Sequence, residues 1–197
     1  MNPALVIIDM QNYFFNYEKR EIALPSLVDS INNLIEWAKN HEIPIFQVIT
    51  IHKKNRYIQN LMVNEKDCFA LIEGTKEAKI VSGINYDENQ ILIKKTRQDT
   101  FINTNFENKL EELDIDTLIF SGVFTHGCVG KTAITAFQKG YRTILSKQAT
   151  LSDKSNDEKV MFEVIENDQQ QFMMGNNEIK EFIIDEVLRE IENEESK

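Results

Sequence analysis

The chain has 197 residues, of which 42% are hydrophobic and 27% charged, and its formal net charge is −10. This length fits one domain with its own core, so we expect a single domain over residues 1–197. The acidic excess disfavours nucleic acid as a partner, because it repels phosphate backbones. No apolar run reaches the roughly 20 residues that a membrane helix needs, so we expect no membrane partner.

The N-terminal stretch and the cysteines indicate a cytoplasmic protein. The apolar stretch that begins at Ala4 lacks a preceding basic region and contains Asp9, which predicts a buried strand rather than a signal peptide. Cys68 and Cys128 are far apart and show no CxxC spacing. Without a secretory signal, both cysteines are expected to stay reduced.

Apolar runs and helical periods alternate in the first half of the chain. Residues 4–8 form a continuous apolar run, which is typical of a parallel strand buried on both faces. Pro25 fits the first turn of a helix, whose apolar face comprises Leu27, Ile31, Leu34, Ile35 and Ala38. A second strand is predicted over residues 43–49. Residues 52–65 are polar and irregular, which favours a surface segment near the site.

The second half continues the alternation. Strands are predicted over residues 91–94, 117–120 and 141–145, with a short sixth strand near 171–174. Helices are predicted through Phe106, Leu110 and Leu113, through Val129, Ala133, Ala136 and Phe137 up to Gly140, over about residues 156–167, and from about Glu178. Strands separated by helices imply right-handed βαβ units. We therefore expect a three-layer, doubly wound, mainly parallel six-stranded sheet, which is Rossmann-like.

Three residues with catalytic chemistry fall at the carboxyl ends of predicted strands, where such sheets bind ligands. Cys128 opens the helix after the fourth strand, and backbone N–H groups there favour a thiolate. They are also suited to hold an oxyanion. An inert buried cysteine fits the same spacing equally well.

Asp9 and a lysine are the other two candidates. Asp9 ends the first strand and is suited to act as a general base, although an aspartate that caps the next turn also fits. Lys94 and Lys95 both end the third strand. Because strand residues alternate between faces, only one of them points into the site, and a surface lysine is the alternative for either.

Four segments carry a family resemblance in their order and spacing. They are Leu5-Val6-Ile7-Ile8-Asp9-Met10-Gln11-Asn12 with Phe14, Glu73-Gly74-Thr75 with Ala78 and Ile80, Lys95-Thr96-Arg97-Gln98-Asp99-Thr100-Phe101, and Gly122-Val123-Phe124-Thr125-His126-Gly127-Cys128-Val129 with Thr132-Ala133, Ala136 and Gly140-Tyr141. With these segments the chain resembles the isochorismatase-like cysteine hydrolases over residues 3 to roughly 180. That superfamily includes nicotinamidases, N-carbamoylsarcosine amidohydrolases, and ureidoacrylate and biuret hydrolases.

The resemblance implies a role for each candidate. Asp9 matches the general base, Lys95 rather than Lys94 matches the catalytic lysine, and Cys128 matches the nucleophile. The backbone N–H groups of Phe124 and Cys128 match the oxyanion hole, and the bond equivalent to Val123–Phe124 is often cis. Homo-oligomers are usual in the family, so a dimer or tetramer is expected.

The resemblance also bears on the pocket and on metal. Phe14, Phe15, Phe101 and His126 are candidates for the substrate pocket, although core packing is the alternative for each aromatic ring. Metal-binding members carry an Asp-x-His pair after the second strand, where this chain has Thr50-Ile51-His52. One imidazole without a carboxylate makes a poor zinc site, so we expect no metal and no other cofactor.

The expected function is hydrolysis of a C–N bond in a small amide, carbamoyl or ureido compound, through a covalent thioester on Cys128. Two alternatives stay open. One is vinyl ether hydrolysis of the isochorismatase type, although such enzymes commonly lack the nucleophilic cysteine. The other is a non-catalytic member that binds a partner or responds to oxidation through Cys128.

Overall fold

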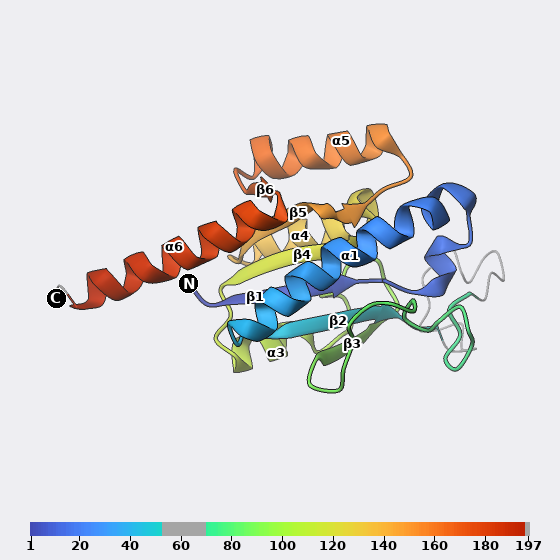
Figure 1. The fold of residues 1–197 in the computed structure, drawn as a ribbon, viewed down its shortest axis with the longest axis horizontal. Coiled ribbons are helices and arrows are strands. Elements are labelled where there is room, and N and C mark those ends of the chain that lie inside the picture. Colours follow the sequence, from blue (N-terminus) through green and yellow to red (C-terminus); the bar gives the residue numbers. More distant parts are fainter. Residues whose placement is uncertain (53–69, 196–197) are drawn as a thin grey trace.

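The computed structural model describes residues 1–52 and 70–195. The predicted residues 53–65 of the surface segment, and Cys68, lie outside this part of the chain. Six strands form one sheet: β1 (Pro3–Ile8), β2 (Ile45–Thr50), β3 (Ile91–Lys95), β4 (Thr117–Val123), β5 (Arg142–Leu151) and β6 (Phe172–Met174). Their order is β3-β2-β1-β4-β5-β6 and every pairing is parallel, which confirms the predicted doubly wound sheet (Figure 1).

Helices cover both faces of the sheet, which gives three layers (Figure 1). Between the strands lie η1 (Asn12–Phe15), α1 (Glu18–Asn40), α3 (Phe106–Glu112), η3 (Thr125–Val129), α4 (Gly130–Gln138), α5 (Ser155–Glu163) and η4 (Val164–Asp168), and α6 (Asn176–Glu195) follows β6. Helices α1 and α6 pack on one face, while α3, α4 and η4 pack on the other. No helix in the described ranges is long and apolar enough to cross a membrane.

Strand β1 shows why the sheet is buried on both faces. Its side chains alternate between the two apolar clusters, with Leu5 and Ile7 in the α1 cluster and Ala4, Val6 and Ile8 in the α4 cluster. All five are 0% exposed. The continuous apolar run of the sequence therefore reflects two cores that share one strand.

The largest differences from the predicted element boundaries are at the start of α1 and the end of β5. Helix α1 begins at Glu18, so Pro25 lies inside the helix rather than in its first turn. Glu18 and Glu21 occupy the true first turn, where negative charge favours a helix start. Strand β5 continues to Leu151 because its pairing with β4 resumes at Thr150 after an irregularity, past the polar residues at which the sequence pattern ended the strand.

The predicted helix over 156–167 is α5 followed by the π-helical turn η4.

Helices α3 and α4 each leave one of their predicted core residues partly exposed. Leu113, at the C-cap of α3, is 37% exposed, and Phe137, near the end of α4, is also 37% exposed. Both helices are short and end at the rim of the layer, so their last apolar side chains project past the core.

Candidate active site

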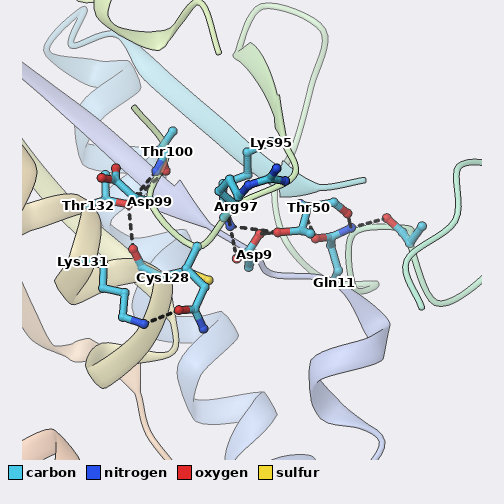
Figure 2. Close-up of polar contacts among 12 residues, drawn as sticks. Asp9, Gln11, Thr50, Lys95, Arg97, Asp99, Thr100, Cys128, Lys131 and Thr132 are labelled. Atoms are coloured by element: carbon cyan, nitrogen blue, oxygen red, sulfur yellow. Dashed lines mark hydrogen bonds and ion pairs between the residues drawn. The ribbon is translucent and has the colours of Figure 1, made fainter. Parts of the chain in front are cut away.

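The three predicted catalytic residues meet at one edge of the sheet. Asp9 directly follows β1, Lys95 ends β3, and Cys128 lies in the turn η3 after β4. Strand β1 lies between β2 and β4, and β3 adjoins β2, so the carboxyl ends of these parallel strands are neighbours. Figure 2 shows the side chains of Asp9, Lys95 and Cys128 near one another at this edge.

Asp9 and Lys95 form a buried ion pair. The Lys95 Nζ lies 2.6 Å from the Asp9 Oδ2, and both side chains are 0% exposed. The Asp9 backbone is held as well, because its N–H donates to the Val48 carbonyl over 2.8 Å. Asp9 has a φ of 56°, which turns the chain out of the strand. A charge buried this deeply requires an opposite charge and hydrogen bonds.

The Lys95 ammonium finds an acceptor for each of its three N–H groups. It donates to Asp9 Oδ2, to Thr50 Oγ1 over 2.8 Å and to the Arg97 carbonyl over 3.1 Å. Burial acts to lower the pKa of Lys95, but the negative charges of Asp9 and of an ionised Cys128 outweigh burial and raise it. Lys95 is therefore a fixed positive charge in the site.

Strand alternation separates the two candidate lysines as predicted. The Lys95 residue is 1% exposed. The Lys94 side chain is 50% exposed and pairs with Glu73 over 2.7 Å at the surface. Lys95 is thus the lysine that faces the site, and Lys94 faces solvent.

Cys128 is buried, and its environment favours the neutral thiol. The pKa of Cys128 is raised to about 12, first by burial and then by the charge of Asp9, while Lys95 acts in the opposite direction. The sequence-based expectation of a thiolate favoured by the helix N-terminus is therefore wrong for the free protein, because burial dominates. A group that takes the thiol proton is required before attack.

The backbone around Cys128 is tightly packed. The Val123–Phe124 peptide bond is cis. Gly122 has a φ of 103°, and a Cβ there would collide with the Ile8 carbonyl oxygen. Thr132 Oγ1 donates to the Cys128 carbonyl over 2.7 Å. Among the described residues, no backbone carbonyl accepts from the Phe124 N–H, which leaves it available to a ligand.

Two of the four predicted pocket residues cluster around Phe124. Phe14 meets the Phe124 ring edge-on at 5.7 Å between centroids, and His126 stacks on it at 5.8 Å. The Arg20 guanidinium lies 4.5 Å from the Phe124 ring centroid and pairs with Asp153. Burial and Lys154 lower the pKa of His126, which favours the neutral imidazole.

The other two predicted pocket residues take part in apolar packing. Phe15 is 5% exposed and belongs to the cluster beneath α1. Phe101 packs against Phe106 at 5.0 Å and Tyr141 at 6.1 Å, between ring centroids. These contacts fit the core-packing alternative for both residues.

Thr50 and Gln11 belong to the site, although sequence reasoning assigned them no part in it. The Thr50 hydroxyl donates to Asp9 Oδ1 over 2.8 Å. Gln11 accepts from the Thr50 N–H over 2.8 Å and donates to the Thr50 carbonyl over 3.0 Å. The available signal was polarity, since Thr50 ends a mainly apolar strand and Gln11 lies three residues after the apolar β1.

The stretch Thr50-Ile51-His52 at the end of β2 does not fit a metal site. Thr50 has no carboxylate, and its hydroxyl is hydrogen-bonded to Asp9 and Lys95. His52 is therefore the one imidazole that this stretch could offer to a metal. His52 is buried, and its Nδ1 has no partner within the described ranges. Burial, Lys95 and Arg97 lower the pKa of His52. Residues 1–52 and 70–195 contain no group of three or more His, Cys, Asp or Glu side chains able to hold a metal ion.

The fold and the site together define the class of protein. A doubly wound parallel sheet carries an Asp–Lys pair and a cysteine at its carboxyl edge, and the chain belongs to the isochorismatase domain family, which matches residues 3–174. A solved structure of an isochorismatase family protein from Desulfovibrio vulgaris superposes with a TM-score of 0.82 at 22% identity, covering 93% of this chain and 98% of the other.

Named relatives include amidases. Nicotinamidase 3 from Arabidopsis thaliana is 27% identical over 153 residues, which cover 75% of this chain and 72% of the relative. N-carbamoylsarcosine amidase from Arthrobacter is 29% identical over 77% of this chain and 60% of the relative. Enterobactin synthase component B from Escherichia coli K12 is 28% identical over 80% of this chain, but the match spans only 55% of that protein. The family is thus one of hydrolases that includes enzymes acting on C–N bonds.

Proposed function

We propose that this protein hydrolyses a C–N bond in a small amide, carbamoyl or ureido compound through a thioester on Cys128. The buried pair of Asp9 Oδ2 and Lys95 Nζ, 2.6 Å apart and beside Cys128, carries this proposal. The relatives named nicotinamidase and N-carbamoylsarcosine amidase support the bond type.

Acylation begins with a proton transfer. Because the pKa of Cys128 is about 12, the thiol is neutral near pH 7, and Asp9 takes its proton as the sulfur attacks the carbonyl carbon. The carbonyl oxygen becomes an oxyanion held by the N–H groups of Phe124 and Cys128, with Lys95 compensating the negative charge. The C–N bond then breaks, and the leaving nitrogen takes the proton from Asp9.

Deacylation reverses these roles with water as the nucleophile. Asp9 takes a proton from water as its oxygen attacks the thioester carbon. The C–S bond breaks, the acid product leaves, and the proton held by Asp9 returns to the sulfur. The cycle consumes one water and needs no oxidant, reductant or metal.

The test combines turnover with detection of the intermediate. The protein is incubated with a panel that includes nicotinamide, N-carbamoylsarcosine and simple ureido acids. Ammonia release is measured, and peptide mass spectrometry identifies any acylated cysteine. We expect a transient acyl group on Cys128, and a loss of activity of about a thousandfold or more in Cys128→Ala.

Cys68→Ala is the matched control and is expected to keep native activity. Full activity of Cys128→Ala on a vinyl ether substrate would instead favour ether hydrolysis. If no panel compound is hydrolysed and no adduct forms on Cys128, the proposal is refuted and a binding or redox role gains support.

A further inference from the structure

Thr50 lies between the two charged residues of the site. We propose that Thr50 is a positioning residue, whose hydroxyl fixes the Asp9 carboxylate and the Lys95 ammonium relative to each other. The inference rests on the proposed function, because it assigns Asp9 the role of base.

The direction of the Thr50 hydrogen bonds follows from the chemistry of the partners. An ammonium group only donates, so Lys95 Nζ donates to the Thr50 oxygen over 2.8 Å. The hydroxyl hydrogen is then directed at the other neighbour, Asp9 Oδ1, also 2.8 Å away. The carboxylate oxygen accepts this hydrogen. The Thr50 hydroxyl therefore bridges Lys95 and Asp9 and orients the carboxylate.

The backbone fixes the hydroxyl in place. Thr50 ends β2 directly opposite Lys95 of β3 in the parallel register. The Gln11 amide bonds both the N–H and the carbonyl of Thr50, and Gln11 is itself fully buried. Thr50 is 8% exposed, so water has little access to replace its hydroxyl. Because each Asp9 oxygen has a different donor, Thr50 on Oδ1 and Lys95 on Oδ2, the carboxylate cannot rotate without losing a bond.

Removal of the hydroxyl therefore has a specific consequence. Without the hydroxyl, Asp9 Oδ1 loses its donor, and the carboxylate can turn away from the position in which it takes the Cys128 proton. We therefore expect kcat to fall while KM stays nearly constant. A residue with a merely structural role lowers stability without separating kcat from KM in this way.

The experiment compares Thr50→Val, Thr50→Ala and Thr50→Ser with a matched control, Thr143→Val. Thr143 is buried in β5, and its hydroxyl has no partner within residues 1–52 and 70–195. Two readouts are measured at pH 7: kcat and KM on an amide hydrolysed by the native protein, and the rate of Cys128 alkylation by iodoacetamide, followed at the level of the peptide. Unfolding in urea shows that each variant is folded.

We expect Thr50→Val and Thr50→Ala to lower kcat about tenfold or more at nearly constant KM, and to lower the alkylation rate of Cys128 about tenfold. Thr50→Ser restores both values, and Thr143→Val leaves both unchanged. An unchanged kcat in both hydroxyl-free variants, or a Thr50→Ser variant that behaves like Thr50→Val, overturns the inference.

Alkylation keeps this test separate from the proposed function. If the native protein hydrolyses no amide, the proposed function fails, but the alkylation rate still reports how well the site activates the Cys128 thiol. Slower alkylation in Thr50→Val and Thr50→Ala, with restoration in Thr50→Ser, supports the positioning role even then. An unchanged alkylation rate rejects it whatever the activity.

Discussion

The two edges of the sheet differ in the kind of group that they bury, which is a pair of charges at one edge and a neutral donor at the other. At the carboxyl edge, the charged atoms of Asp9 and Lys95 are fully buried, and Thr50, Arg97 and the opposite charge supply their partners. At the amino edge, a cavity of about 360 Å³ lies between the end of α1 and α6, and its lining is mainly apolar. Trp37 lines this cavity, and its buried Nε1 has no partner in the described part of the chain.

The difference follows from the free energy of burying each group. A buried charge without a partner costs several kcal/mol, whereas one neutral N–H costs about 1–3 kcal/mol. The amino edge can therefore leave a donor unsatisfied, while the carboxyl edge cannot leave Asp9 or Lys95 alone. Hydrogen bonds are concentrated where the fold holds charge, and that charge is what the proposed chemistry needs.

The largest effect on stability and activity is expected from Lys95→Met, which removes one of the two buried charges at the carboxyl edge. The change leaves Asp9 as an uncompensated buried charge, so we expect the free energy of unfolding to fall by about 3–5 kcal/mol and activity to be lost. Lys94→Met is the matched control. Its surface pair with Glu73 is exposed, so we expect a change below about 1 kcal/mol and native activity. Urea denaturation measures the free energy of unfolding of both variants. Equal losses of stability in the two would contradict the assignment of Lys95 to the buried ion pair.

A second prediction concerns alkaline pH. The thiol of Cys128 has an ordinary pKa of 9.0, and burial raises it to about 12 in the folded protein. Between these values the unfolded chain releases a proton that the folded chain keeps, so stability is lost as pH rises. The slope is about 1.4 kcal/mol per pH unit.

Cys128→Ala removes this contribution. Above pH 9.0 the free energy of unfolding of the native protein should therefore fall more steeply than that of Cys128→Ala. Cys68 is present in both proteins, so its titration cancels in the difference. Urea denaturation series at pH 8, 9 and 10 measure the two slopes. Parallel curves would mean that the thiol titrates alike in the folded and unfolded chains.

The sequence predicts the fold and the three central residues because those depend on local pattern. Continuous apolar runs identify the parallel strands, and the carboxyl ends of those strands contain Asp9, Lys95 and Cys128. Alternation predicts that only one lysine faces inward, and the structure confirms this. The resemblance then selects Lys95, and Lys95 is the lysine that the structure buries beside Asp9.

The sequence did not predict properties that depend on contacts between segments far apart in the chain. Thr50 bridges Asp9 and Lys95 only because β2 lies between β1 and β3 in a particular register, which no local pattern encodes. The pKa of Cys128 rises because the folded chain buries the thiol, whereas the expectation of a thiolate considered only the backbone N–H groups at the helix N-terminus. The long β5 depends on its pairing with β4, which resumes after a polar interruption.

The smallest effect is expected at the amino edge, from Trp37→Phe. The substitution keeps an aromatic ring against α6 and removes the Nε1–H group that has no partner among the described residues. The lost ring contacts destabilise the fold, but removal of an unsatisfied buried donor offsets them, so we expect the free energy of unfolding to change by only about 1 kcal/mol. Activity should stay native, because the residue lies at the opposite edge from Cys128. A loss of about 3 kcal/mol or more would mean that Nε1 is hydrogen-bonded, and the two edges would then follow the same rule.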